Sequence, residues 1–365
     1  MIKVGITELH GIAQEYTKAP PPGVEYSAAS SSGKYADIIF KSHAKGVYHY
    51  VNSPAHDIIE APIFPVITKQ PWIYTPAHFA SAGAFNYFGI PTPRFLKMLF
   101  VERYLARDNL KRLLFKSHYG VRSLKTYGNI SSPEILAKTD VVHPIVRRID
   151  DSLINYQNDH INILFVGEFI GKGGMNVVDA FLRLRKKFSH IKLILCSNEN
   201  FQTTDTQLKN TYLKKIKECP DIEMAFHTRE HLLAYIYPQA DIFISPTYRE
   251  AWGFAIQEAM AFGKPIISTN INAIPEMIEH QQNGILLNIQ EHPYIKGFKG
   301  FNIVNPPQDL MTYMTDEIYV QLEKMITDFD YRKKLGLAAL DTARTKFSPE
   351  QRNVRMKAIY EESLY

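Results

Sequence analysis

The sequence predicts an α/β protein built from two doubly wound, Rossmann-like domains, each with a parallel sheet between helices. The chain has 365 residues, which is about two and a half times a typical domain of ~150 residues. Its second half alternates short apolar runs with amphipathic segments, a pattern typical of parallel strands joined by helices. The first half repeats this alternation more faintly. With 45% hydrophobic and 22% charged residues, the composition excludes a disordered chain, a fibre and a coiled coil.

The first domain is expected to span residues 1–146. Apolar runs predict its strands at 2–7, 37–40, 47–51, 57–59, 72–75 and 112–116, and periodic segments predict helices at 94–106 and 119–127. Residues 18–32 contain three consecutive prolines, a glycine and a run of serines, which indicates a loop leading into a short helix. A last strand is expected at 141–144, where it ends at a proline.

The second domain is expected to span residues 147–347, beginning with a polar linker at 147–160. Strands are predicted at 161–166, 191–196, 222–226, 241–245 and 265–268, with helices from 175 onward and at 208–217, 229–237 and 254–262. Residues 348–365 predict a helix that crosses back to the first domain, with Ser348 as N-cap and Pro349 in the first turn. Its apolar positions include Val354, Ile359 and Leu364.

Charge and cysteine content exclude several classes of protein. The net charge of +5 is spread along the chain and is too small to predict nucleic-acid binding. Two cysteines cannot form a disulfide framework. No apolar run reaches the ~18 residues that a membrane span needs, and the N-terminus does not have the pattern of a signal peptide. A soluble, cytoplasmic protein is expected; peripheral membrane contact and a homodimer stay open.

A glycine-rich turn follows the strand at 161–166. It resembles a dinucleotide fingerprint, but Asn176 stands where the third glycine belongs. A Walker A loop also fails, because Lys172 is followed by Gly173 rather than by Ser or Thr. Backbone amides at the start of a helix, together with Lys172, could still hold a diphosphate. An ordinary solvated lysine is an equally good interpretation.

The signals for a metal site are weak. His227 and His231 have helical spacing but no third ligand. Asp328 and Asp330 form a D-x-D pattern between two helical stretches, where a solvated helix end is the better interpretation. We therefore expect no metal.

One constellation stands out between residues 240 and 269. A buried strand ends at Ser245, Glu250 lies in the following loop, and a helix begins near Gly253 with free amides. Glu258 projects from that helix eight residues after Glu250. Carboxylates accept hydrogen bonds from sugar hydroxyls, and helix N-terminal amides suit a diphosphate.

These residues resemble the retaining GT-B glycosyltransferases of glycosyltransferase family 4, also called group 1. The family's E-x7-E motif is present as Glu250 and Glu258 within Glu-Ala-Trp-Gly-Phe-Ala-Ile-Gln-Glu. Segments 165–174, 274–278 and 283–286 also resemble the family, so the likeness is specific over residues 161–290. It is moderate in the first half, at 22–25, at 71–78 and at 117–128.

The resemblance implies a GT-B fold, with two domains facing across a cleft and closing during catalysis, and a role for each matching residue. Glu250 would lie near the hydroxyls of the transferred sugar, which His78 would contact from the first domain, and Glu258 would bind the ribose. The other expected donor contacts are the amides of Trp252, Gly253 and Phe254 near phosphate or sugar, Phe226 and His227 along the base, and Gly23, Lys172 and Gly173 near the diphosphate.

The chain also departs from the family pattern. Many relatives carry an arginine and a lysine in the glycine-rich turn. In this chain Glu168 stands at the arginine position, and Gly173 stands at the lysine position, with Lys172 one residue before it. Relatives often have a double glycine in the first loop, whereas this chain has Pro22-Gly23.

The predicted function is metal-independent transfer of a hexose, with retention, from a nucleotide sugar to a hydroxyl of a glycan or glycolipid. GDP-mannose is the expected donor and UDP-glucose the alternative. Three other readings remain open: a non-catalytic sugar-nucleotide-binding protein, a same-fold sugar-nucleotide epimerase, and a nicotinamide-dependent oxidoreductase.

Overall fold

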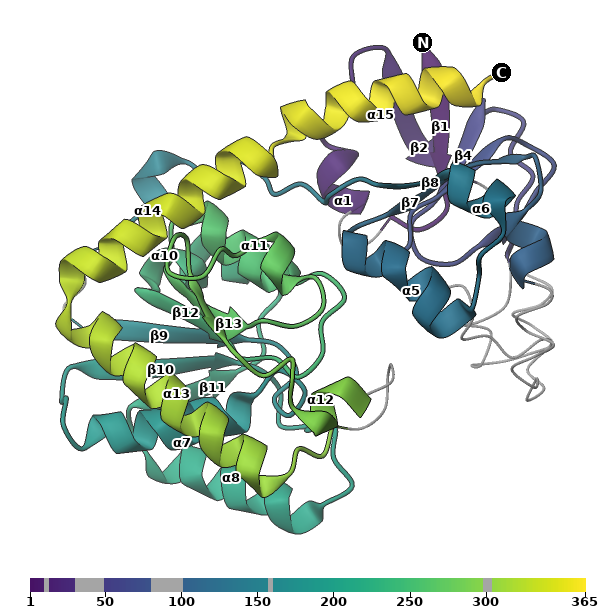
Figure 1. Cartoon of the computed structure of the whole chain (residues 1–365). Helices are drawn as coiled ribbons and strands as arrows, with labels where there is room; N and C mark the ends of the chain where they lie inside the picture. Colours follow the sequence, from purple (N-terminus) through teal and green to yellow (C-terminus); the bar gives the residue numbers. More distant parts are fainter. Residues whose placement is uncertain (10–12, 30–48, 80–100, 157–159, 298–303) are drawn as a thin grey trace. The chain divides into compact units, whose positions relative to one another are not determined.

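The computed structural model describes residues 1–9, 13–29, 49–79, 101–156, 160–297 and 304–365. The chain divides into two compact units, each of which is described separately below. The first comprises Met1–Arg147 together with Phe347–Tyr365, and the second comprises Arg148–Lys346. Figure 1 labels their elements along the chain. The expected sheet strand at 37–40 and most of the expected helix at 94–106 lie outside the described residues, although residues 101–105 are helical.

The first unit contains a six-stranded parallel sheet with the order β2-β1-β4-β6-β7-β8. These strands are β1 (Ile2–Ile6), β2 (Val24–Ala28), β4 (Ile58–Ala61), β6 (Trp72–Tyr74), β7 (Leu110–Phe115) and β8 (Thr139–Val141). The short strands β3 (His49–Tyr50) and β5 (Val66–Ile67) pair separately. Its helices include α1 (Ala13–Tyr16), α5 (His118–Gly128), α6 (Pro133–Ala137) and α15 (Pro349–Ser363). The order runs outward in both directions from β1 and β4, as in a doubly wound sheet.

Two expectations about the first unit are wrong. Residues 18–32 were expected to form a loop and a short helix, but Val24–Ala28 is an edge strand paired with β1. In α15 the expected apolar positions Val354 and Leu364 are exposed, and only Ile359 of the three is buried. The helix instead packs Met356, Ile359 and Tyr360 against the sheet. Ser348 does cap the helix, because its side chain accepts from the amide of Gln351.

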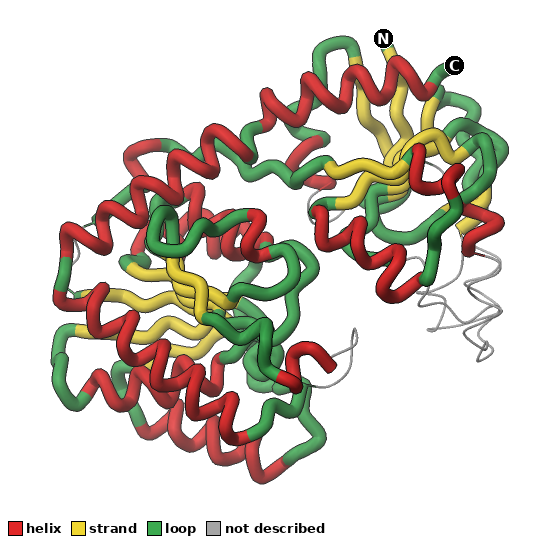
Figure 2. The backbone as a smooth tube through the Cα atoms, in the orientation of Figure 1, coloured by secondary structure: helices red, strands yellow, loops and turns green. Residues whose placement is uncertain are grey.

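The second unit repeats the architecture with the strand order β11-β10-β9-β12-β13-β14, all parallel. Its strands are β9 (Ile161–Val166), β10 (Ile191–Cys196), β11 (Ile222–Ala225), β12 (Ile242–Ser245), β13 (Ile266–Thr269) and β14 (Ile285–Leu287). The longer helices are α7 (Gly174–Arg185), α8 (Thr206–Glu218), α11 (Phe254–Ala261), α13 (Gln308–Thr327) and α14 (Phe329–Lys346). Shorter helical segments are η2 (Asp151–Leu153), α9 (Arg229–His231), η3 (Leu232–Ile236, a π-helix), α10 (Tyr237–Gln239), η4 (Ile274–Glu276) and α12 (Pro293–Gly297). Figure 2 shows the strands as one layer with helices around them.

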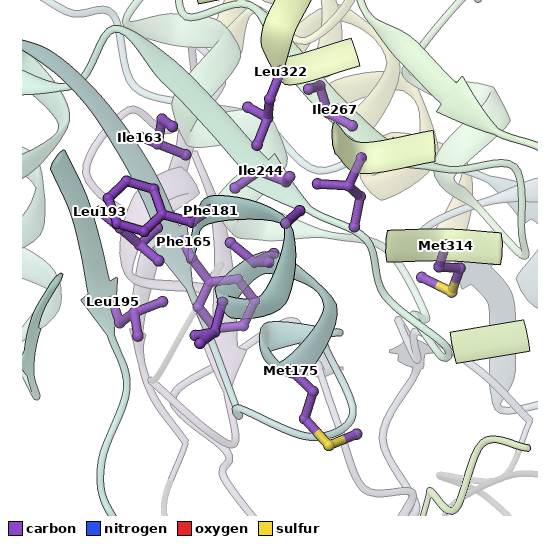
Figure 3. Packing of buried hydrophobic residues seen from close by; sticks show 14 of the residues in the cluster. Ile163, Phe165, Met175, Phe181, Leu193, Leu195, Ile244, Ile267, Met314 and Leu322 are labelled. Atoms are coloured by element: carbon purple, nitrogen blue, oxygen red, sulfur yellow. The ribbon is translucent and has the colours of Figure 1, made fainter. Parts of the chain in front are cut away.

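The core of the second unit explains why its strands could be recognised in the sequence. Strand residues such as Phe165, Leu193 and Ile244 are fully buried, because helices cover both faces of the sheet. Figure 3 shows them packed with Phe181 of α7, while Leu322 of α13 contributes to the same cluster. Such strands read as continuous apolar runs. No helix among the described residues is long and apolar enough to cross a membrane.

Candidate functional site

Two loops of the second unit lie at the point where the strand order reverses. Strand β9 pairs with β10 on one side and with β12 on the other, and the chain leaves the carboxyl ends of β9 and β12 in neighbouring loops. In doubly wound sheets, ligands bind outside the carboxyl ends of strands at this switch point. The first loop is the glycine turn (residues 167–173), and the second is the glutamate loop (residues 246–253).

The glycine turn is fixed by packing against the glutamate loop. Gly173 has φ +79°, and a Cβ on it would overlap the carbonyl oxygen of Pro246. The amide of Tyr248 donates to the carbonyl oxygen of Gly171 at 3.0 Å, and the hydroxyl of Thr247 donates to the same oxygen at 3.2 Å. Gly173 therefore permits close approach of the two loops, which is a sufficient reason for a glycine there. Its expected contact with a diphosphate stays a prediction.

Glu168 caps the glycine turn from within. Its Oε1 accepts from the amides of Ile170 and Gln202, both at 3.0 Å, and its Oε2 accepts from the amide of Gly171 at 2.5 Å. The carboxylate at the position where many family members carry arginine thus satisfies three backbone donors. This use of the side chain explains the departure in structural terms.

Lys172 and Glu250 form an ion pair between the two loops. The other carboxylate oxygen of Glu250, Oε1, accepts from the amides of Ala251 at 3.0 Å and Trp252 at 3.3 Å. Glu250 is therefore a partly buried, oriented carboxylate. The amide of Trp252, which the sequence assigned to the donor, is used for Glu250 in this structure.

The helix that follows the glutamate loop begins at an unusual backbone position. Gly253 has φ +105° and precedes α11, and a Cβ on it would lie 3.0 Å from the Met277 side chain. The side chain of Trp252 is buried and donates to Gln257, whereas Phe254 is partly exposed. Residues 253–254 thus form the start of α11, where amide groups lack partners within the helix.

Glu258 is buried on α11, and two side chains that the sequence analysis did not identify donate hydrogen bonds to it. Arg229 donates to its Oε1 at 2.6 Å, and the phenol of Tyr237 donates to its Oε2 at 3.0 Å. Burial, followed by the charge of Glu258, raises the pKa of Tyr237 far above its ordinary value, so the phenol keeps its proton. Arg229 lies two positions after His227, which is expected along the base together with Phe226. This proximity was the only feature of the sequence that could have identified Arg229 as a site residue.

The segment after β11 carries a group of exposed rings. Phe226 is 72% exposed. The rings of His227 and His231 are stacked with centroids 4.7 Å apart, and Tyr235 lies 5.0 Å from His231. The i, i+4 histidine pair is therefore part of an aromatic stack. Among the described residues, no group of three metal-ligating side chains is close enough to hold an ion. Asp328, of the D-x-D pattern, caps α14 by accepting from the amide of Tyr331.

The structure does not fit the expected position of Gly23. Its carbonyl oxygen accepts from the amide of Ile2, and it immediately precedes β2 in the sheet register. Gly23 consequently lies at the amino edge of the parallel sheet, whereas ligands bind at the carboxyl edge. The loop at the carboxyl end of β1 begins at Thr7 and includes residues 10–12, which lie outside the described residues.

His78 follows β6 near the carboxyl edge of the first unit's sheet, and it is only 6% exposed. Its ring packs between Tyr119, with centroids 5.4 Å apart, and Tyr127, at 4.6 Å. Burial lowers the pKa of His78 to about 4. The imidazole is therefore neutral at pH 7, and contact with a sugar stays a prediction.

The lowered pKa of His78 predicts a pH-dependent loss of stability. An unfolded chain binds a proton on His78 near pH 6.5, whereas the folded chain resists protonation until about pH 4. The free energy of unfolding should therefore fall by roughly 2 kcal/mol between pH 7 and pH 5 because of this residue. The free energy of unfolding of His78→Phe, measured with urea, should depend less on pH than that of the wild type. Equal pH dependence in wild type and His78→Phe would contradict this account.

A family model and several curated proteins match parts of the chain. Residues 160–294 match the family model described as glycosyl transferases group 1. A 41.2 kDa protein from the cps region of Klebsiella pneumoniae is 26% identical over 255 residues, covering 67% of this chain and 66% of the relative. A capsular polysaccharide biosynthesis glycosyltransferase of Staphylococcus aureus is 22% identical over 205 residues, covering 56% of this chain and 46% of the relative. The matched region thus spans between about half and two thirds of these relatives.

Solved structures match the fold over nearly the whole chain. A glycosyltransferase from Rickettsia africae ESF-5 has a TM-score of 0.62 at 16% identity, covering 100% of this chain and 98% of that one. An Anabaena protein crystallised with UDP and glucose also has a TM-score of 0.62, at 13% identity, covering 98% and 99% of the two chains. The expected fold class is confirmed: the chain has the GT-B fold, and residues 160–294 within it are similar to the glycosyl transferases group 1 family.

Proposed function

We propose that this protein is a glycosyltransferase that moves a hexose from a nucleoside-diphosphate sugar to a hydroxyl group of a glycan or glycolipid. The observation that carries the proposal is the pair Glu250 and Glu258 at the switch point of a Rossmann-like sheet. One carboxylate is held in a loop and the other is buried in the helix that the loop leads into. The match of residues 160–294 to the glycosyl transferases group 1 model supports the same class.

The donor's nucleoside would bind near Glu258 and β11. The carboxylate of Glu258 can accept hydrogen bonds from ribose hydroxyls, because an ionised carboxylate is an acceptor with several lone-pair sites. Arg229 and Tyr237 donate to its two oxygens and fix its orientation. Phe226 and the His227–His231 stack provide exposed aromatic surface for a base. This broad surface supports a purine, and GDP-mannose is the donor that we propose, with UDP-glucose as the alternative.

The donor's diphosphate would bind between the start of α11 and Lys172. Helix N-terminal amides and a lysine both favour developing negative charge. Lys172 contacts Glu250 in the structure, so a bound diphosphate would share this ammonium group or take it over. These two sources of positive charge could serve where other transferases use a metal ion, and we propose a metal-independent reaction.

We further propose that the reaction retains the anomeric configuration. The bond between the anomeric carbon and the diphosphate oxygen breaks, and the acceptor oxygen bonds to the same face of that carbon. The acceptor's proton passes to the departing phosphate oxygen, which leaves a nucleoside diphosphate. Glu250 would orient the hydroxyls of the sugar during this step.

A donor-hydrolysis assay tests the proposed reaction without knowledge of the acceptor. The protein should slowly release free hexose and nucleoside diphosphate, and proton NMR should detect the released sugar first as the anomer present in the donor. Addition of EDTA should not change the rate. The opposite anomer would contradict retention. An epimerised sugar would favour the epimerase, and binding without turnover would favour the non-catalytic binding protein.

A further inference from the structure

A buried hydrogen bond connects the glutamate loop to the helix that follows the glycine turn. The phenol of Tyr248 donates to Oδ1 of Asn176 at 2.7 Å. Tyr248 is 1% exposed and Asn176 is fully buried. Asn176 is the residue that interrupts the glycine pattern of a dinucleotide fingerprint, and the proposed function gives it no role.

The other hydrogen bonds of Asn176 fix the direction of its amide group. Its Nδ2 donates to the carbonyl oxygen of Met311 at 2.9 Å and to Oγ1 of Thr315 at 3.0 Å. Both acceptors lie on α13, which packs along α7. With both donors of Nδ2 used, Oδ1 faces Tyr248 as an acceptor. Asn176 therefore fixes the Tyr248 phenol relative to two helices of the core.

Tyr248 is also tied to the glycine turn through its backbone. Its amide donates to the carbonyl oxygen of Gly171, next to Lys172. The single hydroxyl proton of the preceding residue, Thr247, lies between the carbonyl oxygens of Gly171, at 3.2 Å from the hydroxyl oxygen, and Arg249, at 2.6 Å. Glu250, two residues after Tyr248, forms its ion pair with Lys172 between the same two loops. Tyr248 thus anchors the loop by its side chain and its backbone immediately before the oriented carboxylate.

We propose that Tyr248 and Asn176 are positioning residues that hold the carboxylate of Glu250 where the transferred sugar binds. The inference rests on the proposed function. A buried hydrogen bond of this length limits how far the loop can move, and a misplacement of about 1 Å at a reacting centre can lower a rate by roughly a hundredfold. Both side chains are buried inside the second unit, so they would act through Glu250 and not by direct contact with the donor.

The test compares Tyr248→Phe with a closely matched control, Tyr212→Phe. Tyr212 is also a buried tyrosine of the second unit, and its phenol donates to Asp179 at 2.7 Å, but it lies on α8. Each substitution removes one hydroxyl group and should destabilise the fold to a similar extent. Only Tyr248→Phe should lower kcat for donor hydrolysis, by about tenfold or more, while the Kd for the nucleoside diphosphate changes less than about twofold.

Hydrogen exchange of the free protein gives a second readout that needs no donor. The amides of Ala251 and Trp252 donate to Glu250, so they report directly on the position of its carboxylate. Peptides covering 246–253 should exchange faster in Tyr248→Phe than in wild type or Tyr212→Phe. Unchanged exchange there, or hydrolysis equal to that of Tyr212→Phe, would overturn the positioning role. A wild-type protein that neither binds nor hydrolyses a nucleotide sugar would overturn the proposed function and, with it, this inference.

Discussion

Replacing Glu250 by glutamine is expected to lower the rate of sugar transfer by roughly 100- to 1,000-fold, the range found when one preorganised electrostatic contact is removed from an active site. The substitution keeps the shape of the side chain but removes the charge that pairs with Lys172. The amide that replaces the Glu250 carboxylate is also a weaker hydrogen-bond acceptor for the hydroxyls of the sugar. The affinity for the nucleoside diphosphate should change little, because Glu250 is assigned to the sugar.

Glu258→Gln is the matched comparison, since it is the same substitution on the other carboxylate of the motif. The neutral amide of glutamine would no longer form an ion pair with Arg229, and its oxygen would accept hydrogen bonds from ribose hydroxyls less strongly than a carboxylate does. The Kd for the nucleoside diphosphate should rise by about tenfold, which corresponds to ~1.4 kcal/mol. Rates measured at saturating donor, together with calorimetric Kd values, separate the two effects. Equal loss of affinity in both variants would contradict the assignment of separate roles.

Replacing Arg352 by alanine is expected to destabilise the first unit by about 3–5 kcal/mol, the cost of breaking a buried charge network. The Arg352 guanidinium lies over the ring of Tyr16, 4.0 Å from its centroid. The phenols of Tyr16 and Tyr360 donate to the two carboxylate oxygens of Glu60, which is fully buried. Without Arg352, the charge of Glu60 would lose one of its positive neighbours, of which Lys116 is another.

Arg355→Ala provides the control on the same helix. Arg355 pairs with Asp140 at the surface, and both side chains are about half exposed, so its loss should cost less than about 1 kcal/mol. The chain has two tryptophans, Trp72 in the first unit and Trp252 in the second. Urea unfolding followed by fluorescence in a Trp252→Phe background therefore reports on the first unit. Similar midpoints for Arg352→Ala and Arg355→Ala would contradict the role of the buried network.

Much of the second unit could be predicted from the sequence because its signals are local. The strands β9 and β10 have the predicted bounds, since both consist largely of apolar residues between polar turns. Edge strand β2 was missed for the opposite reason. Its sequence, Val-Glu-Tyr-Ser-Ala, is short, half exposed and preceded by prolines, so local chemistry favours a loop. Pairing with β1 decides its conformation.

The site contains contacts that local patterns do not report. The spacing of Glu250 and Glu258 was readable, whereas the partners of Glu258 come from a segment that shows no matching motif. The glycine at 173 is required by Pro246, which is distant in sequence and adjacent in the fold. The network around Glu60 joins residues 300 positions apart. Such contacts depend on the topology of the sheets, so the periodicity of the sequence does not predict them.

Calorimetric titration of the wild-type chain tests the central claim, that the switch point of the second unit binds a nucleotide sugar. GDP-mannose, UDP-glucose, UDP-N-acetylglucosamine and NAD should be titrated in turn under identical conditions. The account predicts saturable heat from a nucleotide sugar, GDP-mannose first among them, and weaker binding of the same donor by Glu258→Gln. Saturable heat from UDP-glucose alone would overturn the proposed donor. Heat from NAD, with none from any nucleotide sugar, would contradict the glycosyltransferase account as a whole.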